Sequence, residues 1–274
     1  ISEVIIKDKL GSVYNTTYNY SNGYYDPAEK EFRGFGYVSK RDTEGNVTEN
    51  WFLQDEVTQG KLSQLTIKDS DGKIFSEIKN IWTNQSPHPG TYIVSLGETN
   101  QYTYDGSPSF KQKRVTFQYD SYGNQTSMKE WGDTEVNGDE REAISRYAYN
   151  LIDWLISYPN HIIIKDYKGD TVQEKWLSYD GASTYAMKPK KGLLTKEENA
   201  VFNPLTKDTQ KAVIEYRYDT FGNPIKLIDP LGRITSTEYD PDLHTFPVTI
   251  TNSLHQVSKY TYDPKLGVVL TTTD

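Results

Sequence analysis

The chain repeats a Tyr-Asp-x-x-Gly-Asn motif, and this repetition restricts its fold more than any other feature. The stretch YDSYGNQT at 119–126 returns as YDTFGNPI at 218–225. Asp favours the first position of a type I turn, and Gly at the fourth accepts the left-handed conformation that closes a bulged hairpin. Each motif therefore predicts a strand, a reversal and a second strand. The predicted turn residues are Tyr119, Asp120, Gly123, Asn124, Tyr218, Asp219, Gly222 and Asn223.

Pairs of the form Asp-x-x-Gly recur along the whole chain, far more often than scattered Asp and Gly residues would produce. They stand at Asp8/Gly11, Asp42/Gly45, Asp69/Gly72, Asp120/Gly123, Asp166/Gly169, Asp219/Gly222 and Asp229/Gly232. A longer variant runs from Tyr262 and Asp263 to Gly267. An irregular period with a constant unit is typical of a repeat architecture.

The segments before these turns alternate between apolar and polar residues. In VTFQYD at 115–120 and IEYRYD at 214–219, every second residue is apolar or aromatic. This period of two predicts half-buried strands, and the 22 Tyr residues favour the same conformation. We expect an all-β fold of stacked antiparallel hairpins.

We expect residues 1–274 to form one continuous repeat domain, because no Pro-rich or Gly/Ser-rich linker divides them. Two stretches, 132–161 and 189–208, break the pattern and are interpreted as inserted loop regions. The first predicts a short helix around Glu140 to Trp154, and the second one helical turn. With Ile at position 1 and the ending TTTD, the chain is expected to be a segment of a longer protein.

Composition excludes several classes of function. The absence of Cys removes disulfides, thiolate metal sites and Cys nucleophiles. A net charge of −8 without long runs of either sign argues against a nucleic-acid partner. No apolar run approaches the roughly 20 residues of a membrane-spanning helix.

The sequence predicts no catalytic, cofactor or metal site. His88, His161, His244 and His255 stand far apart, without metal-ligand spacing. The repeated aspartates suit turns better than acid catalysis, because an Asp that accepts backbone hydrogen bonds is stabilised as the anion. A hydrolase is therefore the least favoured class of function.

A second motif lies near the start of the chain, in GYYDPAEKEFRGFGYV at 23–38. Its core consists of Phe32, Arg33, Gly34, Phe35 and Gly36. The two glycines favour a bulge or a close backbone approach, with both Phe side chains packed inward.

FRGFG followed by YRYDTFGNPIKLIDPLG at 216–232 resembles the YD-repeat, or Rhs, family. The resemblance is to the Rhs shell region of insecticidal toxin complex B components and Salmonella-plasmid-virulence-type proteins. It implies a curved or spiralling β-sheet ribbon that encloses a toxic polypeptide. The implied partners are the rest of the shell and a C-terminal toxin or toxin subunit, and the implied location is outside a bacterial cell or on its surface.

Two further predictions concern surfaces. Unpaired ladder edges at the ends of such a ribbon would favour edge-to-edge self-association. A cell-surface adhesion or carbohydrate-binding module is the alternative function, because aromatic rows on a sheet bind sugar faces. We expect the Trp residues to pack across strands instead; they are Trp51, Trp82, Trp131, Trp154 and Trp176.

Overall fold

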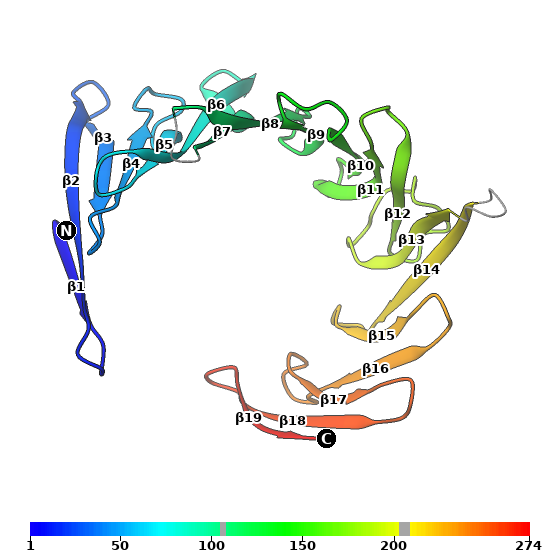
Figure 1. The fold of residues 1–274 in the computed structure, drawn as a ribbon. Coiled ribbons are helices and arrows are strands. Elements are labelled where there is room, and N and C mark those ends of the chain that lie inside the picture. Colours follow the sequence, from blue (N-terminus) through cyan, green and yellow to red (C-terminus); the bar gives the residue numbers. More distant parts are fainter. Residues whose placement is uncertain (105–107, 203–208) are drawn as a thin grey trace. The chain divides into compact units, whose positions relative to one another are not determined.

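The computed structural model is all-β (Figure 1). It describes residues 1–104, 108–202 and 209–274, which form nineteen strands of one sheet and contain no helix. The strands are β1 (Glu3–Lys7), β2 (Val13–Asp26), β3 (Glu31–Arg41), β4 (Val47–Phe52), β5 (Leu62–Lys68), β6 (Ile74–His88), β7 (Thr91–Tyr104), β8 (Phe110–Tyr119), β9 (Gln125–Asp133), β10 (Arg141–Asn150), β11 (Leu155–Lys165), β12 (Thr171–Tyr179), β13 (Leu194–Phe202), β14 (Thr209–Tyr218), β15 (Pro224–Ile228), β16 (Ile234–Tyr239), β17 (Pro247–Thr251), β18 (Val257–Asp263) and β19 (Val268–Thr273). The predicted all-β, antiparallel fold is confirmed.

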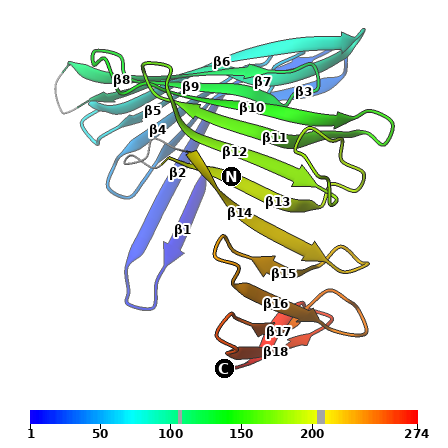
Figure 2. The same cartoon turned by 90° about the vertical axis from the view of Figure 1, so that its right-hand side faces the viewer.

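The strands form two compact units. Unit 1 comprises residues 1–143 and 165–170, and unit 2 comprises residues 144–164 and 171–274. In unit 1 each strand from β1 to β9 pairs antiparallel with the next. In unit 2 the same rule holds from β12 to β19, and Figure 2 shows β11 to β14 side by side. Strands that follow one another in sequence are therefore neighbours in space.

The helix that the sequence predicts around Glu140 to Trp154 is wrong. Arg141–Asn150 is strand β10, and a turn leads from it into β11. The β-branched and aromatic side chains of Ile144, Tyr147 and Tyr149 favour a strand. Asn150 ends it, because its side-chain oxygen accepts the backbone amides two and three residues later, both at 3.2 Å.

The helical turn predicted within 189–208 is also wrong for the described part of that stretch. Residues 194–202 form β13, which pairs with β12 on one side and β14 on the other. Residues 203–208 lie outside the described residues. Hydrogen bonds to neighbouring strands override the local preference of this turn-rich segment.

Among the described strand residues, the buried apolar side chains lie in unit 2, on β10, β11 and β12. They are Ala148, Ile163, Leu177 and Tyr179. The loop at 180–193 is anchored nearby, with Pro189 fully buried and its carbonyl accepting the Asn150 side-chain amide at 2.8 Å. Asp180 fixes the end of the loop by accepting the amides of residues 190, 191, 192 and 193 at 2.6–3.0 Å.

Truncating this core should destabilise the protein. Leu177 is only 6% exposed, so Leu177→Ala should lower the free energy of unfolding by about 2–5 kcal/mol. Leu231 is 76% exposed, and Leu231→Ala should change it by less than about 0.5 kcal/mol. Urea denaturation followed by circular dichroism measures both. Equal effects would show that the buried cluster does not stabilise this fold.

Candidate functional site: the Tyr-Asp turns

The turn after β8 is built around the carboxylate of Asp120. One oxygen accepts the backbone amides of Tyr122 and Asn124, each at 2.9 Å, and the other accepts the Asn124 side-chain amide at 2.9 Å. The Gly123 amide donates to the Asp120 carbonyl at 3.2 Å, which closes the turn. Gly123 has φ of 86°, a left-handed conformation that Gly adopts without strain. Each residue of the motif therefore has a distinct part in the reversal.

The Asp219 turn repeats this geometry. Its carboxylate accepts the amides of Phe221 at 2.9 Å and Asn223 at 2.8 Å, and the Asn223 side chain at 3.0 Å. Gly222 occupies the left-handed position with φ of 91°. The same pair of carboxylate contacts, to the amides two and four residues on, occurs at Asp8, Asp42, Asp69, Asp166 and Asp229.

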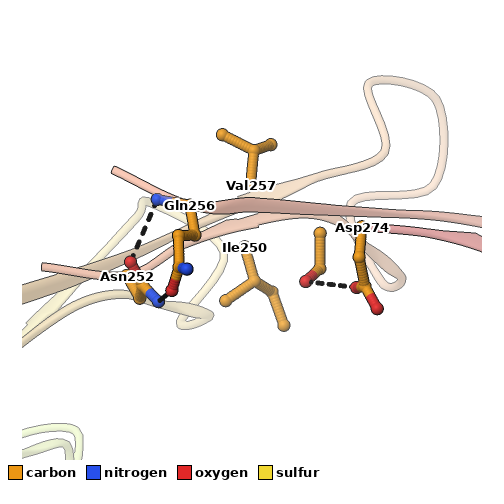
Figure 3. A pocket seen from close by; sticks show the side chains of 6 residues that line it. Ile250, Asn252, Gln256, Val257 and Asp274 are labelled. Carbon is orange, nitrogen blue, oxygen red and sulfur yellow. Dashed lines mark hydrogen bonds between the residues drawn. The ribbon is translucent and has the colours of Figure 1, made fainter. Parts of the chain in front are cut away.

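One turn of this kind has no Asp and no Gly. Asn252 accepts the amides of Leu254 at 2.9 Å and Gln256 at 3.0 Å, and His255 takes the left-handed position with φ of 62°. Figure 3 shows the bonds between Asn252 and Gln256, beside a hollow of about 630 Å³ that Asp274 also lines. A search for Asn as well as Asp at the first position would have found this turn only if it also allowed a residue other than Gly at the fourth.

Two turns are longer. Asp263 accepts the amides of Lys265 at 2.8 Å and Leu266 at 3.2 Å, and Gly267 ends the turn with φ of 68°. In the regular Asp229 turn, Gly232 has φ of 76°. Asp240 accepts three amides, from residues 243, 245 and 246, at 2.6–2.9 Å. An aspartate thus opens the reversal even where the loop length changes.

In four of these turns, at Tyr119, Tyr179, Tyr218 and Tyr239, the Tyr hydroxyl bonds to a backbone carbonyl of the preceding strand or of the segment beside it. The hydroxyl of Tyr119 donates to the Leu96 carbonyl at 3.0 Å, and that of Tyr218 to the Leu194 carbonyl at 2.7 Å. Tyr179 donates to the Pro159 carbonyl at 2.7 Å, and burial raises the pKa of its hydroxyl to about 12, with Tyr158 adding to the rise. A neutral donor is therefore retained at every ordinary pH.

A β-bulge lies at the same place in these hairpins. The register with the next strand shifts by one residue between Gln118 and Tyr119, and again between Arg217 and Tyr218. Identical shifts occur at Tyr179, Tyr239 and Tyr262. Bulges bend a strand and increase its twist, so each Tyr-Asp turn also bends its own hairpin.

The turn carboxylates are held as anions. Partial desolvation raises the pKa of Asp219, but amides of Asn223 and Phe221 outweigh it, so the pKa lies below the usual 3.8. The pKa of Asp229 is lowered in the same way by Arg233, against the same desolvation. Backbone amides of Phe246 and Thr245 lower the pKa of Asp240 to about 2. Such groups are poor general acids at neutral pH.

The FRGFG motif, at the start of β3, is held by an ion pair and a hydrogen bond beside the β2–β3 hairpin. Arg33 pairs with Asp26 at 2.6 Å, and both side chains are largely covered. Gly34 has φ of 80°, and its carbonyl accepts the Gln54 side-chain amide at 2.9 Å. The predicted inward packing of the aromatic residues is wrong.

Phe32 and Phe35 are 55% and 40% exposed and contact one another edge to face, with ring centroids 5.5 Å apart. No helix or second sheet covers them in the described residues, because unit 1 consists of strands alone. Gly36 is held close to Gln54, and a Cβ there would lie 2.7 Å from the Gln54 side-chain oxygen. A larger residue at position 36 would therefore displace the Gln54 side chain, which donates to the Asn22 and Gly34 carbonyls.

The four histidines do not come together. His161 is buried and pairs with Glu174 at 2.7 Å, while its ring stacks on Trp176. His244 stacks on Phe221, with centroids 3.9 Å apart. Among the described residues no group of three or more His, Asp or Glu side chains is arranged to hold a metal ion.

Most Trp side chains pack across strands. Trp51 contacts Tyr37, and Trp131 donates to the Thr116 hydroxyl at 3.1 Å. Trp82 donates to the Leu62 carbonyl at 2.9 Å, and Trp176 lies between His161 and the Lys211 ammonium. Trp154 is the exception, because it is exposed at a left-handed turn position. Four of the five thus join neighbouring strands.

The fold described above is similar to that of solved toxin-complex structures. Residues 1–68 match the family described as the insecticide toxin TcdB middle/N-terminal region. The structure of TcdB2-TccC3 covers 99% of this chain at 14% identity with a TM-score of 0.67. A TcdB2-TccC3 structure without its hypervariable C-terminal region covers 98% at 14% identity, with a TM-score of 0.66.

The Photorhabdus luminescens Tc holotoxin pore covers 95% of this chain at 14% identity, with a TM-score of 0.65. The chain spans 21–22% of the length of these three solved chains. No curated protein sequence matches it. The resemblance to the toxin-complex family is confirmed by the family match at 1–68, and the solved structures show the same fold over nearly the whole chain. None of the described segments is a helix long and apolar enough to span a bilayer.

Replacing the turn glycine should destabilise the protein. In Gly123→Val a β-branched residue would be forced to φ of 86°, and its Cβ would approach Ile93 at 3.2 Å. We expect a loss of about 1–3 kcal/mol in the free energy of unfolding. Gly123→Asn is the matched control, since Asn tolerates this conformation. Equal stability of the two variants in urea denaturation would contradict the conclusion that the turn needs a residue at position 123 that tolerates positive φ.

The Asp240 carboxylate should make stability depend on acid pH. Its pKa is lowered from 3.8 to about 2, so its contribution is complete above the unfolded pKa and is lost as pH falls from about 4 toward 2. We expect Asp240→Asn to lower the urea midpoint at pH 7 and to reduce its change between pH 4 and 2.

Asp71→Asn is the control, because the Asp71 carboxylate accepts no hydrogen bond within the described residues. If the urea midpoint of the wild-type protein rose as the pH fell from 4 to 2, the conclusion that the ionised Asp240 carboxylate stabilises the fold would be contradicted.

Proposed function

We propose that this chain is a non-catalytic wall segment of an Rhs-type shell that encloses a toxic polypeptide in a bacterial toxin complex. The observation that carries the proposal is the fold shared with TcdB2-TccC3 over 99% of the chain. The family match at residues 1–68 supports it independently. In this proposal residues 1–274 are one continuous stretch of repeats, with insertions at 132–161 and 189–208.

The geometry of the turns supports a structural rather than an enzymatic part. A wall needs the same joint many times, and the Asp120 and Asp219 turns share their contacts almost bond for bond. An active site needs a single constellation with a suitably raised or lowered pKa. The carboxylates of Asp219 and Asp240 are instead fully used as acceptors within their own turns.

The partners follow from the same proposal. One partner is the remainder of the shell, whose strands would pair with the edge strands of this chain. The other is a toxin polypeptide held against one face of the sheet. Such a complex acts outside the producing cell, so we place the protein in the secreted or surface-attached fraction of a bacterium. Edge-to-edge self-association of the isolated chain belongs to the same proposal.

A carbohydrate-binding module has less support. Trp82 and Trp131 use their indole N–H groups within the sheet, at 2.9 and 3.1 Å. Lys129 covers the Trp131 ring at 3.7 Å from the centroid. A ring face occupied by a lysine is not available to a sugar.

Protease protection tests the proposal directly. In the assembled complex that contains this chain and its toxin, the toxin should resist proteinase K. The double variant Gly123→Val/Gly222→Val, which strains two joints with φ of 86° and 91°, should make the toxin sensitive. Gly123→Asn/Gly222→Asn serves as the control. A toxin digested equally fast with and without this chain would contradict enclosure.

Photo-crosslinking then asks which face meets the toxin. Lys113 and Gln118 are both exposed on β8 and differ by an odd number of residues, so their side chains project from opposite faces. With p-benzoylphenylalanine at either position, we expect crosslinks to the toxin from one and not from the other. Equal crosslinking from both would argue against a wall with one inner face.

A further inference from the structure

The last Tyr-Asp turn of unit 2 departs from the others at its tyrosine. The Tyr218 hydroxyl donates to the carbonyl of Leu194, which pairs with Tyr179, the tyrosine of the preceding Tyr-Asp turn. The Tyr239 hydroxyl donates in the same way, at 3.5 Å, to Pro224, which pairs with Tyr218. By this rule Tyr262 would donate to Pro247, which pairs with Tyr239. It does not. Within the described residues the Tyr262 hydroxyl has no hydrogen-bond partner.

The Tyr262 ring stacks on Phe246 instead. Their centroids are 4.9 Å apart and the rings are inclined by 22°. Phe246 directly precedes β17, at the place that Leu193 and Asn223 occupy before β13 and β15. An aromatic residue at this place therefore distinguishes this hairpin from the two earlier ones.

The stacked pair helps to line a hollow of about 420 Å³. Its lining residues come from the loop between β16 and β17, from β17 itself, and from the end of β18 with the turn that follows it. The lining residues are Asp240, Asp242, Leu243, Phe246, Val248, Tyr262 and Pro264. The hollow opens to solvent, because Leu243 is 54% exposed.

Two of the residues that line the hollow are acidic, Asp240 and Asp242. Asp242 is exposed, and its carboxylate has no hydrogen bond or ion pair among the described residues. Asp240 remains ionised, since its oxygens accept the amides of Leu243, Thr245 and Phe246. Lys265 follows Pro264 but is not a lining residue. A lining that combines apolar side chains with two carboxylates favours a ligand with an apolar part beside a cation.

We propose that this hollow is a docking site for an extended polypeptide of a partner, presenting an apolar side chain next to an arginine or lysine. The apolar side chain enters between Leu243, Phe246 and Val248. The cation pairs with Asp242, and the Tyr262 hydroxyl is available to a backbone carbonyl of the bound segment. This site does not depend on the shell proposal, because it is defined by departures from the repeated turn.

Short peptides test the site on the full 274-residue chain. Saturation-transfer difference NMR compares acetyl-Leu-Arg-Gly-amide with acetyl-Leu-Glu-Gly-amide and acetyl-Ser-Arg-Gly-amide, with glucose as a sugar probe. The Leu-Arg peptide should bind most tightly, by about twofold to fivefold over the Leu-Glu peptide, as for one exposed ion pair. Asp242→Lys should reverse this preference. Phe246→Ala should weaken both leucine peptides.

Asp71→Asn, a distant exposed acid, should leave every signal unchanged. Because Phe246→Ala removes a half-buried ring, circular dichroism must show that it still folds, and the exposed Asp242→Lys gives an independent result. Equal binding of the three peptides, or a Leu-Arg signal unaffected by Asp242→Lys, would overturn the proposal. Glucose binding lost in Phe246→Ala, with no peptide binding, would assign the hollow to a sugar instead.

Discussion

The fold depends on one recurring interaction, in which a carboxylate accepts the amides two and four residues ahead of it. These amides would otherwise point into the turn without a partner, and a buried or crowded N–H without one is costly. Asp120 and Asp219 satisfy them with the same atoms at nearly the same distances. Because strands that follow one another are neighbours, each turn of this kind aligns the two strands that it joins, as Asp120 does for β8 and β9 and Asp219 does for β14 and β15.

Much of this was predictable because the turn is a local device. Asp, Gly and their spacing lie within four residues, so the sequence alone predicts the reversal at Asp120. The Asn252 turn escaped because His255 takes the left-handed place of Gly. The helix predicted around Glu140 to Trp154 failed for a different reason, namely that strand pairing overrides a weak local preference.

The tyrosine contacts could not be read from the sequence. The acceptor of Tyr218 is the backbone carbonyl of Leu194, 24 residues away, and any residue type offers a carbonyl. The sequence shows the donor, Tyr218, but nothing in it marks Leu194 as the acceptor. The exposure of Phe32 and Phe35 is similar, because burial depends on whether another layer lies over the strand, and no such layer occurs in the described part of unit 1. Local chemistry was therefore predictable, and contacts between hairpins were not.

The bulge beside each tyrosine has a consequence for how such a chain tolerates change in length. A slip of one residue exchanges the two faces of a strand, and in a long uninterrupted ladder that exchange would spread to every later strand. In the β8–β9 and β14–β15 hairpins the alignment is set locally, by an aspartate that fixes the reversal and a one-residue shift at Tyr119 or Tyr218. We therefore expect a change of loop length to be confined to its own hairpin, so that neighbouring repeats differ in length while the faces of their strands stay in phase.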